Sequence, residues 1–462
     1  MLMRILFVAA FISASPILRA QSNTDSALQA VIERLDRLEK QNRELLTEVQ
    51  ELRRQLGGPA QSASADASPP AGSSPPPPAE RLDVQESRTE ELAQTKVGTS
   101  QRMPVSLTGM VLFNAFHNGG FGGGTEVPAS AQLAKSSDSS GATFRQTVIG
   151  LTFNGPDLPG GGKASGNAYF DFWGGSAAPS NNLFRVRTAT LDLAWKNTTI
   201  SAGQDKPIVS PREPTSLAEV GLAPLVGAGN LWDWQPQLRI EQRYSFRNSD
   251  PNGNETGLKL QAGIFETSEV YSSTAPAALS GTLEKQRPAY EARLLFYRGI
   301  PGKRRVEIAP GVHASTTHVA GQSVDSRLGT LDWLIQPANR ISLTGAFFQG
   351  TDDSGLGGLR QGFTLLSSGA AIPVHAAGGW SQLAVTLAPR LSLHIFGGEE
   401  SDRPSDLTPN SVRRNLVYAA NAMYKLAPNV IAALETSQTR TDYILSGTRI
   451  NNHYDLALAY LF

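Results

Sequence analysis

The sequence predicts an all-β transmembrane barrel of about 16 antiparallel strands, preceded by an α-helical coiled coil. Three observations carry this prediction. The last stretch, 450–462, alternates strictly between large apolar residues and smaller or polar ones. The same period of two recurs through most of the chain after residue 101, whereas residues 28–56 follow a heptad. No run after the N-terminus reaches the roughly 18 apolar residues of a spanning helix, so a membrane span must be built from strands.

The final strand predicts how the barrel closes. Its apolar and aromatic face contrasts with a second face that begins with polar residues. An unpaired amide in hydrocarbon costs several kcal/mol, so we expect the last strand to pair with the first and leave no edge. The alternative is the edge strand of a soluble sheet, which the rest of the chain disfavours. The outward residues, which we also expect to form the barrel assembly signal, are Tyr454, Leu456, Leu458, Tyr460 and Phe462.

Composition agrees with a barrel. Of 462 residues 40% are hydrophobic and 44 are Gly, as expected when only alternate strand residues face lipid and the loops are polar. The chain has no Cys, so it relies on no disulfide and carries no lipobox cysteine. A net charge of zero argues against a nucleic-acid partner. We expect no cofactor and no metal.

Residues 1–20 have the layout of a secretory signal peptide. Arg4 precedes the apolar run 5–12, which is too short to span a membrane. Cleavage is expected after Ala20, although Leu18 is unfavourable three residues before the cut.

A coiled coil is predicted within residues 21–56. Asn42 is the single polar core residue and fixes the register, while Arg34 and Glu39 are spaced to pair between parallel chains. Parallel self-association follows, and the core positions alone do not separate a dimer from a trimer. A monomeric amphipathic helix packed on the barrel is the alternative. The core positions are Leu28, Val31, Leu35, Leu38, Asn42, Leu45, Val49, Leu52 and Leu56.

Residues 57–79 are rich in Pro, Ala, Ser and Gly and cannot bury a core, so they form a linker. Residues 80–100 are predicted to form a short charged helix. The barrel then occupies residues 101–462, with strands expected near 105–115, 143–153, 163–173, 183–195, 198–206, 236–246, 256–267, 289–299, 304–317, 324–336, 340–349, 376–387, 390–398, 413–426, 429–440 and 450–462.

The connections between these strands alternate between short and long. Short turns such as Lys196-Asn197 and Ala388-Pro389 contain Asn or Pro. Long polar loops lie between them. An even number of strands places both termini at the end with the short turns, which is the periplasmic end in bacterial barrels.

Together these features resemble the trimeric outer-membrane porins that carry an N-terminal coiled coil. The chain ends Tyr460-Leu461-Phe462, and the run Phe184-Arg185-Val186-Arg187-Thr188-Ala189 precedes Gly203-Gln204 and a loop rich in Pro and Gly. This is similar to the fourth and fifth strands of those porins, which include dicarboxylate- and phosphate-selective members. Val148 departs from the pattern, since an arginine is expected on the second strand.

The resemblance covers nearly the full chain and implies a homotrimer in the bacterial outer membrane, with the coiled coil in the periplasm. Its partners would be outer-membrane lipid, the barrel assembly machinery and small polar solutes. By the same resemblance, residues 207–234 are the third extracellular loop, which folds inward and narrows the channel. A solvated surface loop is the alternative. The charges of the loop and its ends are Asp205, Lys206, Arg212, Glu213, Glu219 and Asp233.

Strand parity adds further candidates for the lumen. Lipid-facing Leu238 and Ile240 turn their neighbours inward. The inward charges predicted in this way are Arg239, Glu241, Arg243, Lys259, Glu291 and Arg293. Arg185 and Arg187 share the parity of lipid-facing leucines, so they lie above the membrane or beyond a bulge, and the pattern does not assign them to the lumen.

The sequence contains candidates for two other kinds of site. His313 and Ser315 share a strand face, a spacing similar to that of outer-membrane phospholipase, but no third group that would orient the His is evident. Glu399, Glu400, Asp402 and Asp406 could bind Ca²⁺, yet their spacing does not match a known pattern of calcium ligands, which favours an acidic solvated loop.

The sequence therefore predicts a passive, water-filled diffusion porin and not an enzyme. Its excess of inward positive charge favours a weak anion preference. The competing hypothesis is a structural barrel that its coiled coil tethers.

Overall fold

The computed structural model describes residues 105–175, 182–247, 253–266, 284–285, 288–319, 322–359, 362–366, 368 and 370–462. The predicted signal peptide, coiled coil, linker and short charged helix lie outside these residues. Within them, no helix is long and apolar enough to cross a membrane.

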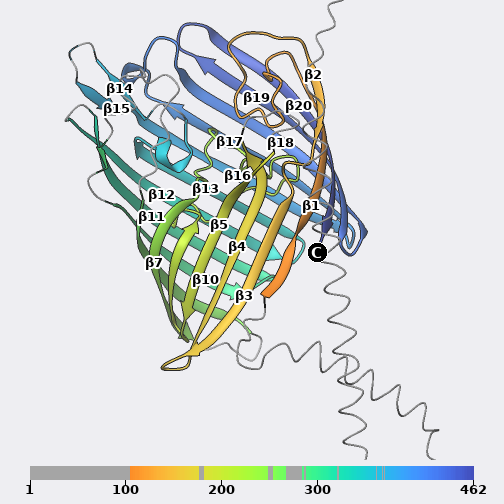
Figure 1. The fold of residues 1–462 in the computed structure, drawn as a ribbon, viewed down its shortest axis with the longest axis vertical. Coiled ribbons are helices and arrows are strands. Elements are labelled where there is room, and N and C mark those ends of the chain that lie inside the picture. The colour runs from red at the N-terminus through yellow and green to blue at the C-terminus, as the bar shows by residue number, and fades with distance from the viewer. Residues whose placement is uncertain are drawn as a thin grey trace, which may run out of the picture. The chain divides into compact units, whose positions relative to one another are not determined.

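The described residues form a closed antiparallel barrel (Figure 1). Its sheet contains 18 strands, of which β2 (Ser139–Thr143) and β9 (Glu284–Lys285) are short. The other 16 form the wall: β1 (Val105–Asn118), β3 (Val148–Leu158), β4 (Gly162–Gly174), β5 (Leu183–Ala194), β6 (Thr198–Asp205), β7 (Gln235–Arg247), β8 (Glu255–Phe265), β10 (Ala289–Ile300), β11 (Arg304–Val319), β12 (Gln322–Ala338), β13 (Ile341–Thr351), β16 (His375–Ala388), β17 (Leu391–Asp402), β18 (Val412–Ala427), β19 (Val430–Tyr443) and β20 (Gly447–Leu461).

Closure occurs between the first and last strands, as predicted. β1 pairs with β20 from Met110 opposite Leu461 to Asn118 opposite His453. On its other edge, the lower part of β1 pairs with β3 and its upper part with β2. Every long strand therefore has neighbours on both sides, and no wall edge is left to face hydrocarbon.

The alternation in β20 is also confirmed. Tyr454 and Leu456 are 50% and 55% exposed on the outer surface, whereas His453 and Asp455 are buried on the inner one. Many large apolar side chains of the strands point outward in the same way. The interior holds polar side chains, the segments that they bind, and a smaller set of buried aromatic residues that includes Phe348, Trp380 and Phe396.

One predicted strand lies in a different place. The second strand was expected at 143–153, but β3 begins at Val148. Residues 144–147 form a turn, in which the Thr147 amide bonds the Phe144 carbonyl. The Thr147 hydroxyl bonds the Leu112 amide at 3.1 Å and so takes the place of a ladder contact on β1. Alternating side chains did not reveal this turn because Thr and Gln are acceptable in a strand.

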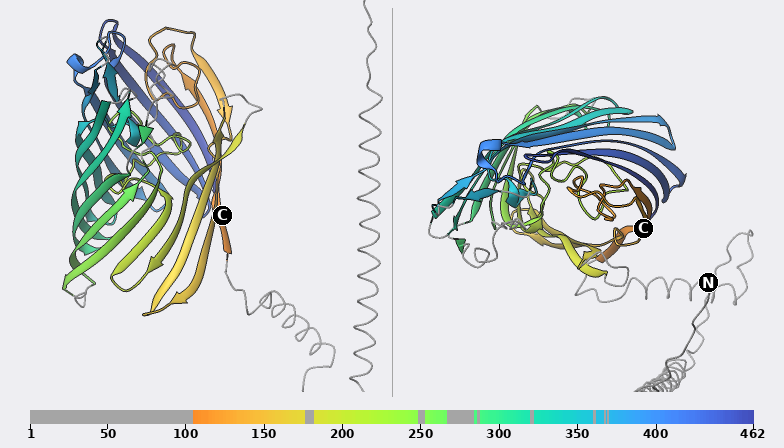
Figure 2. Two further views of the ribbon diagram at one scale, coloured as in Figure 1. Left: turned by 60° about the vertical axis from the view of Figure 1, so that its left-hand side comes forward. Right: turned by 90° about the horizontal axis from the view of Figure 1, so that it is seen from above.

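Three segments at the end of the barrel away from the short turns pack among the inward side chains. They are residues 119–147 between β1 and β3, 206–234 between β6 and β7, and 352–359 after β13, which includes the short helix η2 (Ser354–Leu356). A further short helix, η3 (Pro404–Asp406), follows β17, and β14 (Phe363–Leu365) pairs with β15 (Ala371–Pro373). In the view from above, loops lie inside the ring of strands (Figure 2).

Candidate channel site

Segment 206–234 is held by side chains from several strands of the wall. Asn114 of β1 donates to the Leu217 carbonyl at 2.8 Å, and Asn415 of β18 donates to the Gly227 carbonyl at 3.0 Å. Leu225 and Ala228 pack against Trp380 and neighbouring apolar residues on β16–β18. These contacts fix the segment along its length without a strand or helix of its own.

The wall of β16–β20 also offers acceptors to the interior segments. Ser216 donates to Glu435 at 2.7 Å, and the Thr215 amide donates to Gln382 at 2.6 Å. Glu400 accepts from the Gly229 amide at 3.4 Å and from the Leu359 amide. Glu435 is thus bonded by a side chain of segment 206–234, and Glu400 by backbone amides of segments 206–234 and 352–359.

The acidic group near residue 400 is not the solvated loop that the sequence favoured. Glu400 and Asp402 lie within β17 and are 0% and 4% exposed. Glu399 points outward and pairs with Arg414 at 2.8 Å. Asp406, in η3, binds His375 at 2.7 Å. Alternation along the strand separates Glu399 from Glu400 and Asp402, which share the inner face. The described residues contain no group of ligands that could hold a metal ion.

The other two segments occupy the same half of the lumen. Ala131 of segment 119–147 donates its amide to Thr441 at 2.8 Å and accepts from Tyr443 at 2.9 Å. The Leu356 carbonyl of segment 352–359 accepts from the Trp232 amide at 2.9 Å. Leu356 also packs with Leu231 and Val209 of segment 206–234. The three segments thus support one another.

A polar cavity of about 410 Å³ lies against the opposite part of the wall. It is bounded by β7, β8, β10 and β11 and by Pro211 and Arg212 of segment 206–234. Its charged lining residues are Arg212, Arg243, Lys259, Arg293 and Arg305, with Glu255 and Glu307. Cationic side chains therefore outnumber carboxylates in this lining by five to two.

Most of these cations are paired. Arg293 binds Asp332 through two hydrogen bonds of 2.6 and 2.8 Å, and Lys259 binds Glu241 at 3.0 Å. Arg212 bonds Glu307 and, through Nε at 3.2 Å, Asp332. The Arg243 guanidinium has no ion-pair or hydrogen-bond partner in the part of the chain that the structure describes.

The remaining predicted charges lie around the ends of segment 206–234 or beneath it. Asp205 pairs with Arg239 at 2.8 Å, and Lys206 pairs with Glu213 at 2.7 Å. Glu219 is buried, and its burial together with the nearby Glu435 raises its pKa to about 8. Glu219 is therefore protonated at neutral pH and adds no charge to the lumen.

Asp233, at the other end, is also shifted. Burial raises its pKa to about 6, although a backbone hydrogen bond from Trp234 and the charge of Arg185 oppose the shift.

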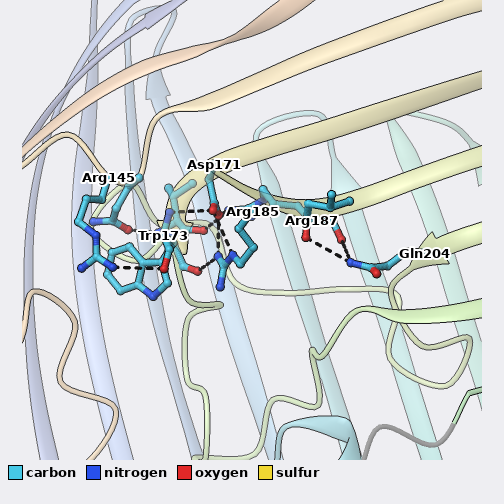
Figure 3. A network of polar contacts seen from close by, with 10 residues as sticks. Arg145, Asp171, Trp173, Arg185, Arg187 and Gln204 are labelled. Carbon is cyan, nitrogen blue, oxygen red and sulfur yellow. Dashed lines mark hydrogen bonds and ion pairs between the residues drawn. The ribbon is translucent and has the colours of Figure 1, made fainter. Parts of the chain in front are cut away.

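Arg185 and Arg187 lie on the inner side of the wall (Figure 3). Both bind Asp171 of β4, which is fully buried, at 2.6 and 2.9 Å. Both also donate at 2.5 Å to carbonyls of segment 206–234, and both guanidiniums lie over the ring of Trp234. The two arginines therefore hold segment 206–234 in place, and Asp171 neutralises part of their charge.

A bulge explains why strand parity did not assign these arginines. Tyr169 pairs with Thr188 and Phe170 pairs with Val186, so Arg187 is the extra residue on β5. The bulge reverses the facing of the residues before it relative to the leucines after it. Of the two positions the pattern allowed, the one beyond a bulge is confirmed.

Arg145 is a lumen residue that sequence reasoning did not identify. It precedes β3, donates to the Trp173 carbonyl at 3.2 Å and lies 4.6 Å from the centre of the Trp173 ring (Figure 3). Glu126 pairs with it at 3.4 Å. An arginine was expected at Val148 itself. The turn at 144–147 places one three residues earlier.

His313 does not form a catalytic pair with Ser315. Its Nδ1 lies 2.9 Å from Glu291, and both side chains are buried. Sequence reasoning did not find this partner, because Glu291 is on the neighbouring strand β10. No hydrogen bond joins Ser315 to His313 among the described residues. The imidazole is therefore not placed to activate the Ser315 hydroxyl as a nucleophile.

No protein-family model matches the chain, and no curated protein matches it in sequence. Solved structures do match in fold. The outer membrane channel DcaP of Acinetobacter baumannii has a TM-score of 0.64 at 16% identity, covering 78% of this chain and 97% of that one. An anion-selective porin from Comamonas acidovorans has a TM-score of 0.51 at 12% identity, covering 78% of this chain and all of the other. The barrel thus has the fold of outer-membrane porins.

Proposed function

We propose that the protein is an outer-membrane porin through which small polar or anionic solutes diffuse passively along a water-filled path. Segment 206–234 narrows this path by folding inward as the third extracellular loop. The observation that carries the proposal is the cavity on the β7–β11 side, where the Arg243 guanidinium has no partner among the residues that the structure describes. An accessible cation in a confined space attracts anions more strongly than it would in open water.

The distribution of the interior segments supports this path. Segment 119–147 contacts β19, β1 and β4, and segment 352–359 packs on β12, β13 and β16, while Glu400 and Glu435 accept hydrogen bonds from segment 206–234. The basic part of the wall carries the cavity instead. A solute would pass where lumen cations are accessible and carboxylates are paired, which gives a weak anion preference.

The wider assembly follows from the sequence. We propose that residues 28–56 join three copies through a parallel coiled coil in the periplasm. The barrel assembly machinery would recognise the outward residues of β20, and the outer surface of the barrel would contact lipid. These features make the protein a homotrimer anchored by its barrels, with the coiled coil separate from the solute path.

The second candidate is a structural barrel that the coiled coil tethers. The number of hydrogen bonds from the wall to segment 206–234 favours it, since a plugged barrel needs an immobile interior. Recording from planar bilayers separates the two. The porin hypothesis requires stepwise conductance from the purified full chain, and complete absence of conductance would establish the structural barrel in its place.

The catalytic hypothesis has a separate test. The purified protein is expected to release no fatty acid from phospholipid vesicles, because Ser315 is not bonded to His313. Hydrolysis by the parent that disappears in Ser315→Ala would reinstate the phospholipase reading.

A further inference from the structure

We propose that Asp332 is a specificity-determining residue of this channel, a positioning residue that holds Arg212 to the wall and sets the net charge of the passage. The inference rests on the proposed function and names the residue that limits the anion preference. Asp332 was not among the charges that strand parity identified. Its importance comes from its partners, which lie on another strand and on segment 206–234.

The surroundings of Asp332 let two arginines reach it. Asp332 is 1% exposed on the inner face of β12, directly opposite Ala309 of β11 and Ala346 of β13. Both neighbours are small, so Arg293 from β10 can extend across β11 and bind both carboxylate oxygens. Arg212 reaches the same carboxylate from the lumen at 3.2 Å.

Glu307 completes the arrangement from β11. It bonds Arg212 and also Arg305. Glu255 of β8 pairs with Arg305 as well, at 3.9 Å. Three carboxylates therefore face three guanidiniums, Arg212, Arg293 and Arg305, and their charges balance. Removing the charge of Asp332 would leave one net positive charge at the edge of the cavity.

The same carboxylate also determines where the segment lies. Arg212 is the residue of segment 206–234 that pairs with the wall of β11 and β12, and Pro211 beside it lines the cavity. If Asp332 loses its charge, one of the two anchors of Arg212 is lost. The passage should then be wider as well as more positive.

These two effects can be told apart. Asp332→Asn keeps the shape of the side chain but removes its charge, so single-channel conductance and anion preference should both rise. Arg212→Met removes the anchor and a cation together, so conductance should rise while anion preference falls. A role of Asp332 in packing alone predicts no change of preference in Asp332→Asn.

The experiment uses the full chain in planar bilayers under a KCl gradient, with reversal potential and conductance as readouts. We expect Asp332→Asn to raise the chloride-to-potassium permeability ratio about two- to fivefold, the effect of one unit charge several ångströms away in water. Glu399→Gln is the matched control, because it removes a carboxylate from the outer surface and should leave the ratio unchanged. An unchanged ratio in a conducting Asp332→Asn channel would overturn the inference.

A second comparison covers the case in which Asp332→Asn fails to fold. Leaving a buried charge unpaired is costly, whereas removing both partners costs less. Arg293→Gln should lower the ratio, and adding Asp332→Asn to it should bring the ratio back toward that of the parent. If the double variant matches Arg293→Gln instead, Asp332 does not set the charge. A parent without conductance would contradict the proposed function itself and not this inference.

Discussion

Arg243 and Arg293 have the same predicted orientation, but they differ in what they offer a solute. Arg293 is 3% exposed and neutralised by Asp332, whereas Arg243 is exposed and unpartnered within the described residues. Strand parity could place both on the inner face, since that depends only on the period of two. It could not reveal their pairing, because the partner of Arg293 lies 39 residues away on another strand.

At the same scale, Glu219 predicts a pH response. Its pKa is about 8 in the folded protein and 4.5 for a free glutamate, so the folded state binds more protons between these values. Stability therefore falls as pH rises from 4.5 to about 8 and then levels off. The contacts of segment 206–234 beside Glu435 should weaken as Glu219 ionises.

The response can be read from thermal unfolding between pH 6 and 9. We expect the parent to lose stability over this range and Glu219→Gln to lose less, because the amide does not ionise. Equal slopes for the two proteins would show that Glu219 is not the responsible group.

For the strands, alternation was a sufficient guide to the wall but not to its irregularities. Closure of β1 on β20 and the facing of β20 follow from the period of two and from the need to pair every amide. The turn before β3 and the bulge at Arg187 break that period for local reasons, through the Thr147 hydroxyl and an extra residue on β5. The lumen positions of Arg145 and Arg187 were hidden by these two features.

The outward face of β20 gives a prediction about this element. Leu456 is 55% exposed on the lipid side, so Leu456→Arg should lower the free energy of unfolding by roughly 2–4 kcal/mol if it lies near the bilayer centre. Asn452→Arg, nearer the extracellular end, should cost only about 0–1 kcal/mol. Urea titration in lipid vesicles measures both. Equal costs at the two positions would argue against this membrane orientation.

In the whole barrel, charge is divided between two sides. The side formed by β7–β11 carries the cavity with its arginines, and Glu400 and Glu435 on β17 and β19 bond to segment 206–234. No single strand reveals this division, because it depends on where segment 206–234 rests. Sequence patterns thus predicted the barrel and the existence of the segment. The side of the lumen that the segment leaves open could be found only from the three-dimensional contacts.

The assembly gives a further prediction. Deleting residues 28–56 should weaken association of the copies, because their core positions are predicted to form the coiled coil. Conductance per channel should stay nearly unchanged, since the solute path lies within the barrel. Native gel migration and single-channel recording test the two statements. A severalfold change in unit conductance would place the coiled coil over the channel mouth.

The central claim is that accessible cations beside segment 206–234 give this barrel an anion preference, and the reversal potential under a KCl gradient tests it most directly. The parent should prefer chloride. Arg243→Ala should reduce that preference more than Arg239→Ala, because Arg239 is already paired with Asp205 at 2.8 Å. Cation preference in the parent, or no shift in Arg243→Ala, would contradict the account.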